Sequence, residues 1–375
     1  MDDLRLQQQR PATVTPEQAP YAVWDPASVA GEAVSALREA LVRAGHPQAA
    51  PGDARLVLYA IDPDRTRPFH RGSASTCVVA VVELDERPKQ MLEEGYPYLV
   101  RALANLCVLL VRSEPGVAHV ITLERGHYAV PLGRDRARDY ARLYEHLRPL
   151  ALSRLVIEND HVGDLPPELW DGDATTDALR RAGARLEGLG LLPAPFPIER
   201  YLSPRELRHV RLLYGIGGLS YGNMSARRDA DSFWMTASGV NKASLEGVGR
   251  DLVLINGFDA DRAALRLSEP PGLERAPRAS VDAIEHWMIY QRHPAVGAIV
   301  HVHAWIDGVA ATSINYPCGT IELASAVADL VAETAQYGRA IVGQKNHGLT
   351  VTGPDLDDIF ERLEGRVVPQ VPMAA

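Results

Sequence analysis

Two histidines separated by one residue are the part of this sequence best suited to chemistry. His301 and His303 follow the apolar residues Ala298–Val300. Because alternate side chains of a strand share one face, we expect both imidazoles to point the same way and to bind one metal ion. A third histidine, His347, precedes Gly348, whose backbone freedom would let the chain bring this imidazole to the same point. Three neutral imidazoles leave at least one coordination position open, which is typical of catalytic zinc.

The ligand types also indicate which metal to expect. Zinc suits three histidines best, although the same ligands bind Fe2+, Mn2+ or Co2+. The three cysteines, Cys77, Cys107 and Cys318, form no Cys-x-x-Cys pair. They predict neither a disulfide framework nor a thiolate metal site, and they are consistent with a reducing cytoplasm.

A carboxylate precedes the histidine pair on a predicted helix at 280–291. Asp282 and His286 lie one turn apart on the same face of that helix, and Asp282 stands 19 residues before His301. One interpretation is a base that returns to the metal ion. The other is a helix N-terminal acid that complements the helix dipole. The sequence leaves both open.

Two glycine-containing turns offer groups that bind anions. The segment 220–227 contains Asn223 and Ser225, and the segment 237–239 contains Ser238. Backbone amides and short polar side chains in such turns form concave sites for phosphate or carboxylate. Ordinary turns are the alternative interpretation.

The composition bounds the class of protein. A chain of 375 residues with 46% hydrophobic and 23% charged residues predicts a globular protein of two domains. The net charge of -9 argues against nucleic acid as a partner and leaves small-molecule substrates open. The polar N-terminus lacks a signal-peptide core, and the best apolar run, residues 99–111, is too short to span a bilayer. We therefore expect a cytoplasmic protein that does not bind membranes.

The pattern along the chain predicts four segments. They are a flexible arm at 1–25, an α/β domain of unknown role at 26–190, a proline-rich linker at 191–202 and a metal-binding domain at 203–375. In the first domain we expect helices near 30–44, 89–103, 134–147 and 176–186, and strands near 55–61, 76–84, 107–112 and 119–123.

Seven short pieces, taken in order, resemble the class II aldolase/adducin family over residues 203–362. That family includes sugar-phosphate aldolases, ribulose-phosphate 4-epimerase, related decarboxylases and dehydratases, and the non-enzymatic adducins. The order of the pieces carries the likeness, because a lone His-x-His motif is a weak signal. The pieces are Gly222–Arg227, Thr236–Gly239, Ser280–Asp282, Tyr290–Pro294, His301–His303, Gly319–Leu323 and Asn346–Gly348.

The resemblance implies a fold, an assembly and a set of site residues. The expected fold is α/β, with a C-terminal α/β/α sandwich around a mainly antiparallel sheet and a separate α/β domain before it. A homo-oligomer, commonly a tetramer, is implied as well. The family pattern corresponds to metal ligands His301, His303 and His347, a catalytic Asp282, and substrate-binding residues Asn223, Ser238, Gly239 and Ser280.

The activity implied is that of a metal-dependent lyase of the aldolase type. It would cleave or form a C–C bond next to a carbonyl of a small hydroxy-carbonyl or sugar-phosphate-like substrate, through a metal-stabilised enolate. Epimerisation and decarboxylation could use the same metal site, and a non-catalytic adducin-like scaffold is a third reading. Two departures from the aldolases, Asp282 in place of Glu and Val281 in place of Ser, suggest an altered substrate that need not carry phosphate.

Overall fold

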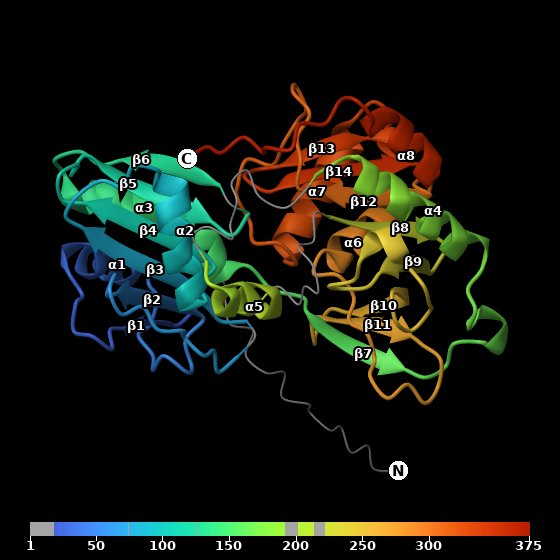
Figure 1. Ribbon diagram of the computed structural model, residues 1–375, viewed down its shortest axis with the longest axis horizontal. Coiled ribbons are helices and arrows are strands. Elements are labelled where there is room, and N and C mark those ends of the chain that lie inside the picture. Colours follow the sequence, from blue (N-terminus) through green and yellow to red (C-terminus); the bar gives the residue numbers. More distant parts are fainter. Residues whose placement is uncertain (1–18, 74, 125, 192–201, 214–221) are drawn as a thin grey trace, which may run out of the picture.

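The protein consists of two sheets with helices on both faces of each, shown by a computed structural model (Figure 1). The structure describes residues 19–73, 75–124, 126–191, 202–213 and 222–375. One sheet has six strands and the other has eight.

The first sheet has the strand order β1-β2-β3-β4-β5-β6. Strands β1 to β4 are parallel, and β5 and β6 are added antiparallel. Its strands are Tyr21–Trp24, Leu56–Ile61, Cys77–Leu84, Leu106–Val111, Val117–Thr122 and His127–Pro131. The inner strands are continuous apolar runs, because helices cover both faces of the sheet.

Helices close the two faces of this sheet. Helices α1 (Glu32–Arg43) and α3 (Arg136–Leu152) bury their apolar faces on one side, and α2 (Met91–Ala102) does so on the other. The predicted helices and strands of this region agree with these elements. Strands β1 and β6 were not predicted.

The second sheet has the order β13-β14-β12-β8-β9-β10-β11-β7, and only the β11–β7 pair is parallel. Its strands, in chain order from β7 to β14, are Glu158–Val162, Gly222–Arg227, Phe233–Thr236, Leu252–Asp259, Ala264–Ser268, Ala298–Val302, Ile341–Gln344 and Gly348–Gly353. Strand β12 lies between β8 and β14, so the predicted metal strand is near the middle of the sheet.

Helices cover both faces of the second sheet as well. Helices α4 (Ala174–Gly188) and α8 (Leu356–Leu363) share a core with one face. Helices α6 (Ala283–Arg292) and α7 (Ile321–Glu333) share a core with the other. The prediction of an α/β/α sandwich around a mainly antiparallel sheet, preceded by an α/β domain, is confirmed.

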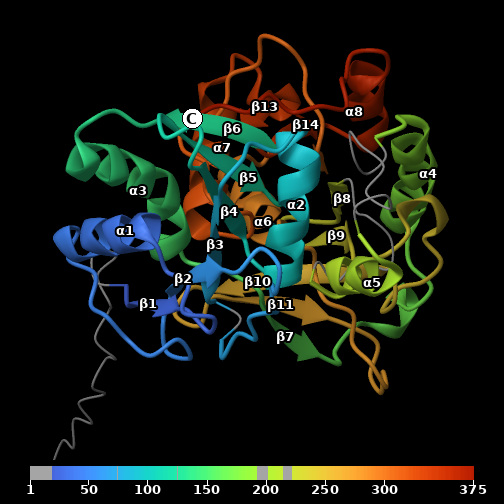
Figure 2. The ribbon, with the colours of Figure 1, turned by 60° about the vertical axis from the view of Figure 1, so that its left-hand side comes forward.

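The sheets divide the chain at a different place from the predicted linker. Strand β7 pairs with β11, and α4 packs on the second sheet, although both fall within the predicted first domain. Helix α5 (Pro204–Leu213) instead contacts α2, and Leu202 lies in the first domain's core (Figure 2). We therefore propose a boundary near 153–157 rather than at 191–202; residues 192–201 lie outside the described part.

Two further predictions are corrected by the structure. The predicted arm at 1–25 contains a buried strand, β1, because its apolar residues pair with β2; residues 1–18 of that arm lie outside the described residues. The predicted helix at 280–291 begins at Ala283, because Val281 and Asp282 form the turn before it. Among the described residues, the helices are all too short or too polar to cross a bilayer.

Candidate metal centre

The three predicted histidines lie together in the second domain. The ring centroids are 5.2 Å apart for His301 and His303, 5.0 Å for His301 and His347, and 4.9 Å for His303 and His347. Each residue places one ring nitrogen within 4.8 Å of the other two. A single cation could therefore be coordinated by all three.

Strand pairing positions the first two histidines. His301 lies in β12, where it is paired with Asn223 of β8 and Thr350 of β14, and its side chain is fully buried. His303 follows one residue after the strand ends. The expectation that alternate side chains share one face therefore holds for His301 and His303, although His303 lies just beyond the end of β12.

The third histidine stands in the turn between β13 and β14. The backbone amide of His347 donates to the carbonyl of Gln344 at 3.1 Å, which closes the turn. Our expectation that Gly348 supplies the unusual backbone conformation is wrong. Asn346 adopts the positive φ of 58° instead. Gly348 is needed because a Cβ there would lie 2.3 Å from the carbonyl oxygen of Val302.

The ring nitrogens fit a metal ion. Among the described residues, Nε2 of His301 and Nε2 of His347 are buried and have no hydrogen-bond partner. Buried polar atoms are rarely left in that state without a ligand or water. Burial lowers the pKa of His301 to about 4, so this imidazole is neutral at pH 7, as a metal ligand must be.

His347 differs from His301 in its electrostatic surroundings. Burial alone would lower its pKa, but the hydrogen bond that His347 donates to the carboxylate of Glu124, with the charges of Glu124 and Asp282, outweighs burial and raises it. A cation at this position would replace that proton. The site therefore combines one imidazole held neutral with one that acidic neighbours stabilise in its charged form.

Asp282 faces this cluster and does not cap the helix. It occupies the N-cap position of α6 but makes no side-chain capping bond. Its Oδ2 accepts a hydrogen bond of 2.7 Å from Nδ2 of Asn223. Its other oxygen, Oδ1, is buried without a hydrogen-bond partner among the described residues. Of the two interpretations of Asp282, this geometry favours the base near the metal.

The charge state of Asp282 suits that role. Burial would raise its pKa, but the imidazoles of His301, His347 and His286 and the hydrogen bond from Asn223 lower it below the ordinary value. Burial lowers the pKa of His286 itself to about 3. Asp282 is thus an ionised carboxylate with one unoccupied acceptor, held in a largely buried site.

The predicted anion-binding residues are neighbours in the fold. Asn223 contacts Asp282 directly. The turn at Ser238 and Gly239 pairs with the segment that leads to Ser280, since the Ser238 amide donates to the carbonyl of Arg278 at 2.8 Å. Gly239 has a φ of 75°, which favours glycine. Their role in substrate binding stays a prediction.

A group of buried polar residues lies beside Nδ1 of His301. Nε2 of Gln344 lies 3.3 Å from Nδ1 of His301 and donates to Glu285 at 2.8 Å. Thr350 donates to the same carboxyl group at 2.5 Å. Burial, together with the negative charge of Asp282, raises the pKa of Glu285 to about 8. The sequence analysis did not single out these residues.

Three more residues near the site were missed. Cys318 places its sulfur within 4.8 Å of ligand atoms of Asp282 and His347. Burial lowers the pKa of the Lys242 ammonium to about 8, against the opposing effect of Asp282. Glu124 comes from the first domain, in which no motif was recognised. For Lys242, its position three residues after the predicted anion-binding Gly239 was a signal that could have placed it near the site.

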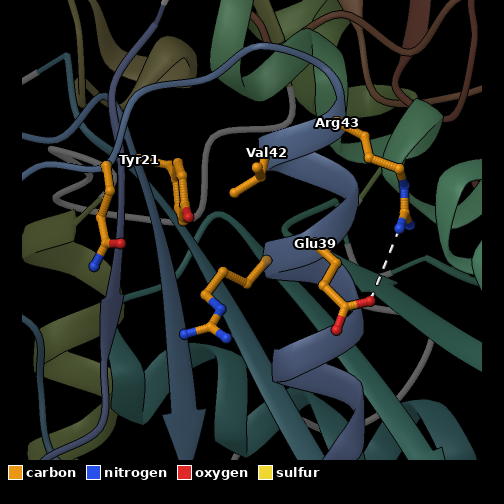
Figure 3. Close-up of a pocket in the computed structure, with 6 residues that line it drawn as sticks. Tyr21, Glu39, Val42 and Arg43 are labelled. Atoms are coloured by element: carbon orange, nitrogen blue, oxygen red, sulfur yellow. Dashed lines mark ion pairs between the residues drawn. The ribbon is translucent and has the colours of Figure 1, made fainter.

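A separate shallow pocket of about 340 Å³ lies on the first domain between β1 and α1 (Figure 3). Tyr21, Glu39, Val42 and Arg43 line it, and Arg43 and Glu39 form an ion pair of 3.8 Å on one side. None of its lining residues belongs to the histidine cluster. The chemistry predicted from the sequence is therefore not located there.

A family model and several named proteins match part of this chain. A family model described as the class II aldolase and adducin N-terminal domain matches residues 208–314. The methylthioribulose-1-phosphate dehydratase of Acidiphilium cryptum is 32% identical over 152 residues, which are 40% of this chain and 61% of that protein. The protein of the same name from Pseudomonas paraeruginosa is 31% identical over 164 residues, which are 42% of this chain and 68% of that protein.

Solved structures give a weaker match. The L-fuculose-1-phosphate aldolase of Thermus thermophilus is 20% identical, with a TM-score of 0.30, and the match covers 49% of this chain and 85% of that one. The sequence matches, together with the ordered motifs, show that the chain belongs to the class II aldolase and adducin family.

Proposed function

We propose that this protein is a divalent-metal-dependent lyase that acts on a small substrate with a carbonyl next to a hydroxyl group. The observation that carries the proposal is the convergence of His301, His303 and His347, with buried Nε2 atoms of His301 and His347 that lack partners, beside an ionised Asp282. When bound, the ion supplies Lewis-acid polarisation of the substrate carbonyl. Zinc is the expected metal, since three imidazoles suit it.

Asp282 would move the proton. Its Oδ1 is the unoccupied acceptor, and the hydrogen bond from Asn223 to Oδ2 keeps Oδ1 directed away from that neighbour. A carbon next to a polarised carbonyl can then lose its proton to Oδ1. Burial excludes water, so the proton remains available for return to the product or to a leaving oxygen.

The proton that Asp282 takes first decides between two lyases. Loss of the neighbouring hydroxyl group as water gives a dehydratase, and the relatives named methylthioribulose-1-phosphate dehydratase favour this outcome. If Asp282 instead takes the proton of the hydroxyl group on the β-carbon, the bond between the α- and β-carbons breaks. The electron pair of that bond stays with the α-carbon and the β-carbon leaves as an aldehyde, which gives an aldolase. Because Val281 replaces a serine of the phosphate-binding pattern, the substrate is expected to differ from those of the sugar-phosphate aldolases.

A direct test combines metal analysis with turnover. The purified wild type should contain close to one divalent ion per chain and should lose it in His301→Ala. Asp282→Asn should keep the ion but lose roughly 10²- to 10⁴-fold in turnover, because only the proton acceptor is removed. A wild type that binds no divalent ion would refute the proposal and would favour a scaffold role.

Substrates then separate the two lyase reactions. Methylthioribulose-1-phosphate and fuculose-1-phosphate should be assayed for loss of water and for aldol cleavage, each beside its unphosphorylated counterpart. We expect water loss to be the faster reaction. Aldol cleavage alone would assign C–C lyase activity instead, and equal rates without phosphate would support a substrate pocket altered at Val281.

A further inference from the structure

One contact crosses from the first domain to the candidate metal site. Glu124 stands just after β5, in the connection to β6 of the first sheet. Its Oε1 lies 3.2 Å from Nδ1 of His347, a residue 223 positions further along the chain. The His347 side chain is 5% exposed and that of Glu124 is 21% exposed, so the contact is mostly shielded from water.

This contact decides which nitrogen of His347 is available. A carboxylate next to Nδ1 accepts a hydrogen bond, so in the neutral ring Nδ1 carries the hydrogen and Nε2 carries the lone pair. Nε2 is the buried atom of His347 that has no partner among the described residues. Histidine ligands of metals commonly donate their other N–H to a carboxylate in this way, which fixes the ring and strengthens the ligand.

Other contacts hold the two turns against each other. The amide of Gly126 donates to Oγ1 of Thr122 at 3.2 Å, which orders the turn that carries Glu124. The side chain of Met373 packs against Gly126, leaving no room for a Cβ there. Ala374 exchanges two hydrogen bonds of 2.9 Å with the side chain of Asn346, the neighbour of His347.

The chain near Met373 therefore joins the two domains at the metal site. Both ribbon views show this segment running from the second domain to a place beside β6 (Figures 1 and 2). His301 is supported differently, because its Nδ1 faces Gln344 of its own sheet. His347 is instead supported by the first domain, through the carboxylate of Glu124.

We propose that Glu124 is a positioning residue for His347, and that the first domain thereby completes the metal site of the second. The inference rests on the proposed function in that the three histidines must bind a divalent ion. It gives the otherwise unassigned first domain a chemical role. A carboxylate largely shielded from water is also costly unless it is paired, and a cation held by Nε2 of His347 would stabilise it.

The experiment measures metal binding by the full-length chain. Wild type, Glu124→Gln and Glu124→Ala are compared for zinc dissociation constant, by competition with a chelator, and for the absorption spectrum of the Co2+-loaded protein. Glu124→Ala should bind zinc roughly 10- to 100-fold more weakly, as is usual when an outer partner of a metal ligand is removed. Glu124→Gln, which keeps an acceptor oxygen, should lose less.

The matched control is Glu114→Gln. Glu114 places Oε2 at 3.3 Å from Nε2 of the buried His119, a similar pair in the same domain but away from the metal ligands. This variant should keep the zinc affinity and the Co2+ spectrum of wild type. Thermal unfolding with and without zinc separates positioning from stability. A purely structural role for Glu124 would lower the transition temperature of the metal-free protein without changing the increase that zinc adds.

Two outcomes would overturn the inference. One is a folded Glu124→Ala protein with the zinc affinity and Co2+ spectrum of wild type; if that variant does not fold, Glu124→Leu, which keeps most of the side-chain volume but has no acceptor, is measured in its place. The other is a wild type that binds no divalent ion, which refutes the proposed metal site as well. Zinc binding that is lost in His347→Ala but unchanged in both Glu124 variants would refute the positioning role alone.

Discussion

At the scale of single residues, the site contains two buried carboxyl groups whose neighbours shift their pKa values in opposite directions. Asp282 faces imidazoles that favour its charged form, and its pKa is lowered despite burial. Glu285 lies one turn further along α6, and burial and the charge of Asp282 raise its pKa to about 8. Two acids with opposite shifts provide one ionised base and one neutral hydrogen-bonding group at pH 7.

Glu285 makes the stability of the metal-free protein depend on pH. Between its ordinary pKa of 4.5 and the folded value of about 8, Glu285 is protonated in the folded chain and ionised in the unfolded chain. The folded state then binds more protons, so stability falls as pH rises through this window. Glu285→Gln should be near wild type at pH 5 and on the order of 3 kcal/mol more stable at pH 8.

Urea unfolding in the presence of EDTA, at pH 5 and pH 8, measures this difference. Glu145→Gln is the control, because Glu145 is an exposed acid on α3 of the first domain. It should follow wild type at both pH values. If Glu285→Gln and wild type lose the same free energy of unfolding between pH 5 and pH 8, Glu285 is not the source of the pH dependence.

At the scale of elements, the site requires the turn between β13 and β14 to approach β12 closely. A Cβ on Gly348 would lie 2.3 Å from the carbonyl oxygen of Val302 and 3.2 Å from Cα of His303. The strand pairing therefore tolerates no side chain at this position. The same approach places His347 beside the other two ligands.

Gly348→Ala should therefore lose stability and metal affinity together. We expect a loss of about 1–3 kcal/mol, the usual cost of overpacking, and weaker zinc binding because β14 must move away from β12. Gly52→Ala is the matched control, since a Cβ there meets no atom within 4 Å. Denaturant unfolding and chelator competition give the two readouts, and a Gly348→Ala protein with unchanged zinc affinity would contradict the argument.

At the scale of the whole molecule, the domains are joined by more than the covalent chain. Helix α5 comes after α4 of the second domain in sequence, but it packs on α2 of the first domain. Arg101 of α2 and Glu206 of α5 form an ion pair there. The Glu124–His347 contact makes a second connection at the metal site. A bound ion is therefore expected to stabilise the folded arrangement of both domains.

Metal removal should lower the thermal stability of the full chain. A ligand that binds only the folded state at 100 times its Kd adds about 2.7 kcal/mol, so zinc should raise the transition temperature and EDTA should reverse the effect. Calorimetry with and without zinc measures the change. His301→Ala is the control and should show no zinc-dependent increase; an increase of the wild-type size in that variant would place the bound ion elsewhere.

The sequence by itself determined the family and the fold class of both halves, and it predicted the three histidines that the structure brings together. It could do so because alternation on a strand and the ordered motifs are local properties of the chain. The same locality explains the success with most helices and strands of the first domain. Assembly as an oligomer, which the resemblance implies, stays a prediction.

Only the tertiary structure decided which distant residues support those ligands. The surroundings of the buried Oδ1 atom of Asp282, the Glu285–Gln344 pair and the Glu124–His347 contact depend on strand order and on how the domains pack, and neither is encoded in a short motif. The segments that form β7 and α5 were predicted in the domains opposite to those on which they pack, for the same reason. The partner of an edge strand or of a surface helix lies far away in sequence. Contacts over such separations are fixed by the packing of the whole chain, because burial and pairing are satisfied only once both partners are in place.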